Sequence, residues 1–301
     1  MLEQDIRDRI QKLVHPFCIT KGERFRLKDF DPGDTGGMTL DKAQGAELVQ
    51  LGTKWLAEEQ DMLYAQDRWS LLIIFQAMDA AGKDSTIKHV MSGVNPQGCQ
   101  VFSFKQPSSE ELDHDFMWRY VIRLPERGRI GIFNRSYYEE VLVVRVHPEA
   151  LKREKLPSQL VGEEIWDERL ADIARFEDYV SRQGTKILKF FLNVSRKEQK
   201  RRFEERLEQP EKNWKFSPSD VMERKFWDDY MEAFEKAIQA TASKHAPWFV
   251  VPADNKWFTR LVVEAAIVDA VGSLGLSYPK LDAAKQKELV AARTALAHER
   301  S

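Results

Sequence analysis

The chain has few of the residues on which several classes of protein depend. Only two of its 301 residues are cysteine, Cys18 and Cys99, which are too few for a disulfide framework or a cysteine-rich metal site. Its 46 basic and 48 acidic side chains leave a net charge of −2, so no overall bias favours nucleic acid. No apolar run is long enough to span a membrane, and Glu3 and Asp5 are unlike the start of a signal peptide. We therefore expect a cytoplasmic protein without nucleic-acid or membrane partners.

The most informative segment is an apolar stretch that leads into a loop of small residues. Residues 70–76 have the length of a strand, and residues 77–85 read Ala-Met-Asp-Ala-Ala-Gly-Lys-Asp-Ser before a segment with helical spacing. Backbone N–H groups and a lysine at a helix N-terminus favour a phosphate chain. The match to the pattern G-x-x-x-x-G-K-[ST] is imperfect, because Ala77 replaces the first glycine and Asp84 the hydroxyl residue. We predict a phosphate-binding loop, and an ordinary turn with a surface lysine is the alternative.

Apolar and amphipathic segments alternate along the rest of the chain. The expected strands are residues 71–76, 100–104, 130–133, 186–192 and 248–251. The expected helices are residues 41–68, 84–94, 109–124, 163–183, 195–208 and 218–244. This alternation predicts an α/β fold, a three-layer α/β/α sandwich around a mainly parallel sheet. Residues 1–40 are expected to form an extended arm, and the tail after Pro279 a solvated or oligomer-contacting helix.

Arginines occur where such a sheet would bind its ligand, at the carboxyl ends of the strands. Arg135 follows directly after the strand at 130–133, and a guanidinium there suits two-pronged contacts with phosphate. Arg119, Arg123 and Arg127 are better explained, from local sequence, as residues at the end of a helix that complement its dipole.

A second basic segment spans residues 196–206, with six basic and three acidic residues. Glu198 can pair with Arg202 four residues later, so a solvated face held by ion pairs is one interpretation. The other is a mobile helix that brings arginines over the phosphate loop and excludes water, as kinase lids do.

Carboxylates near the loop are candidates for a divalent metal site. Mg²⁺ is commonly held by one or two carboxylates together with phosphate oxygens and water. Asp79 lies within the loop, and Glu139 follows the strand that ends near residue 134. Asn134 stands where many phosphate-loop enzymes have an aspartate, and it offers an oxygen but no charge. A plain surface position is the alternative for Glu139.

Five short segments occur in the order of a known family. They are Leu-Tyr-Ala at residues 63–65, the loop at 78–85, Phe-Asn-Arg-Ser-Tyr-Tyr-Glu at 133–139, Ser-Arg-Lys-Glu-Gln at 195–199 and Trp-Lys-Phe-Ser-Pro-Ser-Asp at 214–220. Together they resemble the second polyphosphate kinase family over most of the chain. Asn134 and the residues at 137–141 resemble its class III branch, whose members accept nucleoside mono- and diphosphates.

The resemblance implies a thymidylate-kinase-like P-loop kinase with a helical lid. Residues 1–60 would form an N-terminal arm and accessory helix, residues 61–275 the kinase core with a lid at about 195–245, and residues 276–301 a helical tail. The implied reaction is transfer of the terminal phosphoryl group of inorganic polyphosphate to AMP, ADP, GMP or GDP, with Mg²⁺, which Mn²⁺ can replace. The implied assembly is a homo-oligomer, a dimer or a tetramer.

The resemblance and the charged residues of the sequence together lead us to expect roles for individual residues. Asp79, Lys83 and Arg135 match the family's catalytic positions, and Glu139 joins them. The residues expected to bind the nucleotide or its phosphates are Ala80, Ala81, Gly82, Lys83, Asp84, Ser85, Asn134, Arg201, Arg202 and Arg206. The residues expected to line a polyphosphate channel beside Arg135 are Lys105, Arg127 and Arg129. The expected metal ligands are Asp79, Asn134 and Glu139.

Two other functions fit the same residues. An ATP-dependent nucleoside monophosphate kinase would share the fold, but the basic residues leading away from the loop would then have no purpose. A nucleotide or polyphosphate sensor would bind without turnover. ATP formation from ADP, Mg²⁺ and polyphosphate, with no ATP added, distinguishes the expected enzyme from both.

Overall fold

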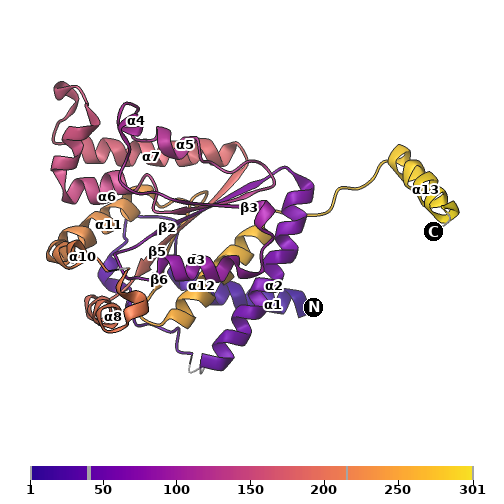
Figure 1. Ribbon diagram of the computed structural model, residues 1–301, viewed down its shortest axis with the longest axis horizontal. Helices are drawn as coiled ribbons and strands as arrows, with labels where there is room; N and C mark the ends of the chain where they lie inside the picture. Colours follow the sequence, from indigo (N-terminus) through magenta and orange to yellow (C-terminus); the bar gives the residue numbers. More distant parts are fainter. Residues whose placement is uncertain (1, 39–41, 215, 300–301) are drawn as a thin grey trace.

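A six-stranded sheet forms the centre of the molecule. The computed structural model describes residues 2–38, 42–214 and 216–299 (Figure 1). The strands are β1 (Cys18–Ile19), β2 (Ser70–Gln76), β3 (Cys99–Ser103), β4 (Ile130–Asn134), β5 (Thr185–Asn193) and β6 (Trp248–Pro252). Their order across the sheet is β1-β6-β5-β2-β4-β3. Only β1 runs antiparallel to its neighbour among these strands. The five predicted strands and the mainly parallel sheet are confirmed.

Helices cover both faces of this sheet (Figure 1). One layer contains α12 (Lys256–Gly272), which packs against α1 (Leu2–Val14), α2 (Lys42–Gln66) and α3 (Lys83–Val90). The other contains α6 (Glu139–Val146), α7 (Ile165–Arg182) and α11 (Trp227–Thr241), which pack against one another. The predicted three-layer sandwich is confirmed. Among the helices described, none is long and apolar enough to cross a membrane.

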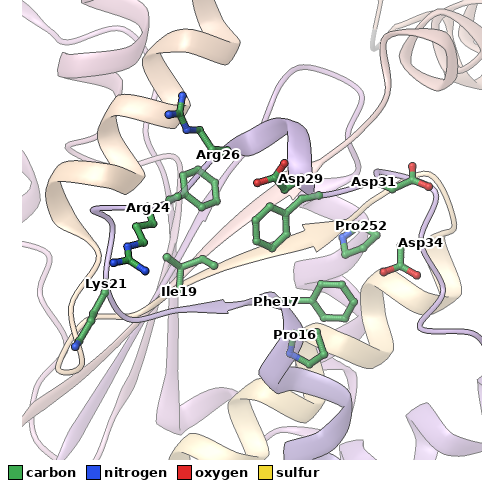
Figure 2. Close-up of a pocket in the computed structure, with 12 residues that line it drawn as sticks. Pro16, Phe17, Ile19, Lys21, Arg24, Arg26, Asp29, Asp31, Asp34 and Pro252 are labelled. Carbon is green, nitrogen blue, oxygen red and sulfur yellow. The ribbon is translucent and has the colours of Figure 1, made fainter.

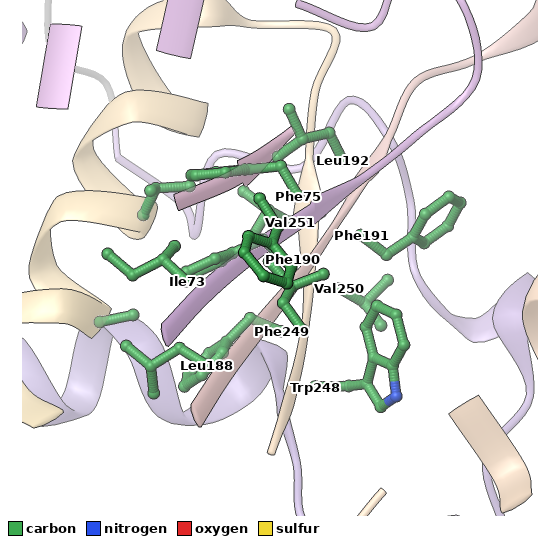
Figure 3. Packing of buried hydrophobic residues seen from close by; sticks show 14 of the residues in the cluster. Ile73, Phe75, Leu188, Phe190, Phe191, Leu192, Trp248, Phe249, Val250 and Val251 are labelled. Carbon is green, nitrogen blue, oxygen red and sulfur yellow. The ribbon is translucent and has the colours of Figure 1, made fainter. Parts of the chain in front are cut away.

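Aromatic rings of the central strands pack together in the core (Figure 3). Phe75, Phe190 and Phe249 lie on three neighbouring strands and stack in a row, with ring centroids 5.2 and 5.1 Å apart. All three rings are buried, and each contributes about 1.5–3 kcal/mol through removal from water. Every residue of β2 is likewise buried, which explains why its sequence is a continuous apolar run. This rigid centre fixes the edge at which the strands end.

The register places the ends of β2, β4 and β5 side by side. Phe75 pairs with Asn134 on one side and with Phe190 on the other. Because the strands are parallel, the segments that follow β2 and β4 leave the sheet at the same edge. This alignment brings the predicted phosphate loop next to Arg135.

The N-terminal region differs from the expected extended arm. It contains α1, and β1 adds a short strand to the edge of the sheet beside β6. The expected boundary at residue 60 falls inside α2, a continuous helix that packs against α12. A two-residue strand has too few positions to show an alternating pattern, so its existence depends on pairing with β6.

Some of the helices differ from those expected: one expected helix is interrupted, and two observed helices were not expected. The helix expected at 109–124 is two short helices, α4 (Ser109–Leu112) and α5 (Trp118–Val121). Between them the Asp115 carboxylate accepts a hydrogen bond from the Met117 N–H at 2.9 Å, which favours a turn. The helices α6 and α12 were not expected from the sequence. In α12, apolar residues lie on nearly all sides, so its sequence shows little helical periodicity.

The C-terminal helix α13 (Ala283–His298) lies apart from the body of the molecule (Figure 1). None of its described side chains is buried. A helix thus follows Pro279 as expected, and whether it is solvated or contacts another copy stays a prediction.

Candidate active site

The phosphate loop occupies the turn between β2 and α3. Gly82 caps α3 with a φ of +108°, a conformation that favours glycine. Ala80 also has a positive φ, +60°, which is strained for a residue with a Cβ atom. The loop is therefore held in a specific curved conformation and ends at a helix N-terminus, where backbone N–H groups favour an anion.

Lys83 lies across the base of this loop. Its Nζ donates to the Ala77 carbonyl at 2.7 Å. Burial, and after it the neighbouring Arg135 guanidinium, lowers the pKa of Lys83, while Asp79 and Glu139 act in the opposite direction. A phosphate group placed beside Lys83 would favour its charged form.

Arg135 is positioned by an unusual turn at the end of β4. Its φ is +67°, and its backbone N–H donates to the Phe75 carbonyl at 3.0 Å. The guanidinium lies 3.4 Å from the Asp79 carboxylate and 3.6 Å from that of Glu139. The nearby Glu139 carboxylate raises the pKa of Arg135, and burial raises the pKa of Glu139. Three of the predicted catalytic residues are thus brought together.

A large cavity of about 900 Å³ opens beside the loop. Its lining includes the loop residues 79–85, together with Lys105, Asn134 and Arg135. Further basic side chains line it from more distant segments, namely Arg202, Arg206, Lys212 and Lys256. Predominantly basic walls around a loop at a helix N-terminus suit a polyanion.

A smaller cavity of about 430 Å³ adjoins the first. Both are lined by Asp79, Gln106, Arg135 and Asp220. The rest of the smaller cavity has a mixed lining, with apolar Met78, Leu142, Val143 and Phe234 beside polar Glu139, His147, Glu223 and Tyr230. Such a lining suits an organic ligand with a few polar groups. The two cavities meet where Asp79 and Arg135 lie.

Another hollow of about 500 Å³ lies beside β1 (Figure 2). Lys21, Arg24 and Arg26 lie on one side of it, and Asp29 and Asp31 on the other. The described residues that line this hollow do not line either cavity at the loop. They also include no residue that was predicted for the site. We place the active site at the loop for this reason.

The segment above the loop contains α8 (Arg196–Glu208), α9 (Pro210–Asn213) and α10 (Pro218–Glu223). The Ser195 hydroxyl caps α8 by accepting a hydrogen bond from the Glu198 N–H at 3.0 Å. The expected lid at 195–245 is too long, because α11 packs in a core layer through buried residues such as Phe234 and Ile238. The candidate lid therefore ends before residue 227.

Arg202 does not have the role that the sequence suggested. Its Nη1 donates to the Ala80 and Ala81 carbonyls at 3.1 and 2.8 Å. Its Nη2 donates to the Ala253 and Asp254 carbonyls at 2.6 and 3.1 Å, and its Nε to Glu198 at 2.8 Å. All five N–H donors of the guanidinium are occupied, so Arg202 joins α8 to the backbone of the loop rather than offering donors to phosphate.

Arg201 and Arg206, the other two arginines of α8 that were predicted to bind phosphate, differ from Arg202 and from each other. Arg201 is 56 % exposed, pairs with Glu198 and Glu205, and lies outside the residues that line either cavity. Arg206 lines the large cavity and lies 3.8 Å from Asp220. Of the three arginines predicted to bind phosphate (Arg201, Arg202 and Arg206), Arg206 is the one placed to reach a bound anion.

Arg127 and Arg129 lie at the opposite edge of the sheet from the loop. They precede β4, and the Arg129 carbonyl accepts a hydrogen bond from the N–H of Leu71 near the start of β2. The Arg127 guanidinium donates to the Arg68 carbonyl at 2.8 Å. Residues before a parallel strand lie at its amino end, so these two arginines do not line the expected channel. Lys105, at the carboxyl edge, does line the cavity.

The carboxylates fit a metal ion that arrives with phosphate. Within the part of the chain that the structure describes, no three or more acidic, cysteine or histidine side chains converge as a complete metal site. Asp79 and Glu139, which share Arg135, are the two carboxylates that could hold a divalent metal ion once phosphate oxygens and water complete its coordination. The Asn134 amide nitrogen instead donates to Asp84 at 2.7 Å, so Asn134 orients a neighbouring carboxylate.

Several residues that line the site were not predicted from the sequence. Asp220 faces both cavities, and burial, followed by the charge of Asp79, raises its pKa. Tyr230, Lys212 and Lys256 also line them. Asp220 ends the segment 214–220, one of the five segments that resemble the family, so the sequence did indicate this position. Tyr230, Lys212 and Lys256 carry no such local signal.

The fold and the site define a P-loop phosphotransferase: a phosphate loop at the carboxyl edge of a parallel sheet, with an arginine and two carboxylates where two cavities meet. The profile of the family described as Polyphosphate kinase 2 (PPK2) matches residues 39–275. The chain belongs to this family, and it is a polyphosphate kinase.

Individual relatives resemble the chain over nearly its whole length. The ADP-polyphosphate phosphotransferase of Rhodopseudomonas palustris is 53% identical over 281 residues, 93% of this chain and 97% of that protein. The AMP/ADP-polyphosphate phosphotransferase of Meiothermus ruber is 41% identical over 267 residues, 89% of this chain and 96% of that protein. The crystal structure of Polyphosphate Kinase 2 from Arthrobacter aurescens is 41% identical, with a TM-score of 0.82, and the match covers 91% of this chain and 95% of that one.

Proposed function

We propose that the protein transfers the terminal phosphoryl group of inorganic polyphosphate to nucleoside mono- and diphosphates, including AMP, ADP, GMP and GDP. The observation that carries this proposal is the meeting of two unlike cavities at Asp79 and Arg135. One is basic and the other is mixed in character, as a polyanionic donor and a nucleoside acceptor require. The relatives named for AMP and ADP support the choice of acceptor.

The polyphosphate chain is assigned to the larger cavity. Lys105, Arg206, Lys212 and Lys256 lie along its walls beyond Lys83, and a chain of phosphates carries negative charge along its whole length. The sequence-based hypothesis gave the loop to the nucleotide's terminal phosphates. We now assign the loop N–H groups to the donor chain because the basic residues surround the loop on that side.

The nucleotide is assigned to the smaller cavity. Its apolar residues, such as Leu142 and Phe234, can contact a base or ribose, and Tyr230 and His147 offer polar contacts. The phosphates of this nucleotide would then point toward Arg135, at the junction with the larger cavity.

Lys83 and Arg135 are the proposed charge-stabilising groups. Phosphoryl transfer needs aligned reactants and positive groups around the transferring phosphoryl, with little covalent work from the protein. Arg135 lies at the junction of the cavities, and Lys83 lies at the loop beside it. Asp79 and Glu139 would hold Mg²⁺, or Mn²⁺ in its place, and the bound metal would neutralise charge on the phosphate oxygens. Closure of the segment at about 196–226 would exclude water.

The assembly and cellular location also belong to this proposal. We expect a cytoplasmic homo-oligomer, either a dimer or a tetramer. Within each copy the kinase core comprises residues 61–275, and the N-terminal elements pack against it. The helix α13 supports an oligomer, because Leu289, Val290 and Leu296 are 50–67 % exposed on it and it lies apart from the body (Figure 1).

The decisive assay is incubation with ADP, Mg²⁺ and polyphosphate in the absence of ATP. ATP formation is the expected result, and the same assay with AMP, GMP and GDP defines the acceptors. Phosphorylation of AMP with ATP but not with polyphosphate would instead identify an ATP-dependent monophosphate kinase. Binding of polyphosphate without any product would identify a sensor.

A further inference from the structure

A buried ion pair joins strand β5 to helix α7, and neither of its residues lines the two cavities. Lys189 of β5 and Glu177 of α7 are 0 and 1 % exposed, and their charged groups are 2.5 Å apart. Lys189 Nζ also donates to the Tyr138 hydroxyl at 3.1 Å and to the Thr241 carbonyl at 2.9 Å. The three N–H donors of the ammonium group are therefore all occupied.

The same pair anchors two consecutive tyrosines. The hydroxyls of Tyr137 and Tyr138 lie 3.0 and 2.8 Å from one oxygen of Glu177. The Tyr138 hydroxyl also lies 2.8 Å from that of Thr241, which accepts a hydrogen bond from Trp248 Nε1 at 2.9 Å. Both tyrosines are fully buried, and burial raises the pKa of each, so both keep their protons as donors.

These tyrosines belong to the turn that carries the proposed catalytic groups. Tyr137 and Tyr138 follow Arg135 by two and three residues, and Glu139 comes next. Arg135 is held at a φ of +67°, which L-residues adopt only where their surroundings impose it. The backbone contacts of the turn include the Arg135 N–H to the Phe75 carbonyl at 3.0 Å and the Glu139 N–H to the Ser136 carbonyl at 2.9 Å. The tyrosine hydroxyls add a second set of constraints, because they contact Glu177 of α7 and, from Tyr138, Thr241 of α11.

A purely stabilising role does not account for this network well. A buried ion pair can often be replaced by apolar residues of similar volume without loss of stability, because desolvation offsets the attraction. Here the pair lies where β5, α7, α11 and β6 meet, and both of its members bond to the turn. The geometry of the pair suits a role in holding the turn at residues 135–139 in one orientation.

We propose that Glu177 and Lys189, acting through Tyr137 and Tyr138, are positioning residues that hold Arg135 and Glu139 in register with the transferring phosphoryl group. The inference rests on the proposed roles of Arg135 and Glu139. A displacement of about 1 Å in groups that align the reactants can lower the rate by about a hundredfold. The network therefore acts on kcat, while the substrates still bind through the cavity walls.

The test replaces the anchoring hydroxyls singly, because removal of one charge from the buried pair can prevent folding. Both substitutions keep the ring. Tyr137→Phe loses the hydrogen bond to Glu177, and Tyr138→Phe loses the hydroxyl contacts with Glu177, Lys189 and Thr241. The matched control is Thr185→Val, which removes a buried hydroxyl that lies 2.9 Å from that of Ser70 at the amino end of the sheet. Arg135→Ala, assayed in parallel, tests the site assignment itself.

We expect kcat to fall about tenfold in Tyr138→Phe, with KM for ADP and for polyphosphate within twofold of wild type, measured well below the unfolding temperature. Thr185→Val should lose thermal stability and keep its kcat. A kcat within twofold of wild type in both tyrosine variants, or a change confined to KM, would overturn the proposal. Near-normal turnover of Arg135→Ala would instead refute the proposed role of Arg135, independently of the tyrosines.

Discussion

Replacing Arg202 by alanine removes the guanidinium that joins α8 to the phosphate loop. The side chain is 5 % exposed and makes five hydrogen bonds, four of them to carbonyls of the loop and of the segment after β6. A hydrogen bond to a charged group is worth about 1.5–3 kcal/mol, but water can enter this partly open site and replace several of them. We therefore expect a loss of about 3 kcal/mol in the free energy of unfolding, the lower end for breaking a buried pair.

Arg201 provides the matched control, because it lies on the same helix and pairs with the same Glu198. It is more than half exposed, so Arg201→Ala should cost less than about 1 kcal/mol. At about 2 °C per kcal/mol for a chain of this size, Arg202→Ala should lower the midpoint of thermal unfolding by about 6 °C, and Arg201→Ala by no more than about 2 °C.

The assay combines thermal unfolding with steady-state kinetics of ATP formation. Arg202→Ala should lower kcat, because the loop carbonyls at Ala80 and Ala81 lose their support. Equal effects of the two substitutions on the unfolding midpoint would contradict this reasoning. An unchanged midpoint with a raised KM for polyphosphate would show that Arg202 binds phosphate directly, as the sequence had suggested.

Further predictions concern the site and its surroundings. Lys83→Ala and Arg135→Ala should each lower kcat by about 10²–10³-fold, equivalent to about 2.7–4 kcal/mol by analogy with the loss of one oxyanion donor. The circular dichroism spectrum of each variant should match that of the wild type. Near-normal turnover would remove the substituted residue from the proposed mechanism. Arg129→Ala should leave KM for long-chain polyphosphate unchanged, because Arg129 lies at the other edge of the sheet, and a raised KM would return it to the channel. Burial raises the pKa of Glu264 from 4.5 to about 7, so the folded state binds the extra proton and stability should fall by about 3 kcal/mol as the pH rises from about 4.5 to above 7. Chemical denaturation across this range should show a flatter profile for Glu264→Gln, and parallel profiles would show that Glu264 is not responsible.

The central strands and the phosphate loop could be predicted from the sequence because their signals are local. Residues 70–76 form an uninterrupted apolar run, and Gly82 and Lys83 follow at the spacing that a strand-loop-helix unit needs. Arg135 could be placed for the same reason, since it directly follows a strand whose direction in a parallel sheet is known. The position of Arg129 was available from the same rule, because a residue that precedes a parallel strand lies at its amino end.

The tertiary structure alone decided what the side chains touch. Arg201 and Arg202 are neighbours in one basic segment, yet one faces solvent and the other bonds to carbonyls about 50 and 120 residues away in the chain. The strand β1 exists because β6 pairs with it, and Lys189 is tolerated in the core because Glu177, Tyr138 and Thr241 surround it. Local sequence sets the conformation of a segment, whereas the free energy of a buried charge depends on partners that only the folded chain brings together.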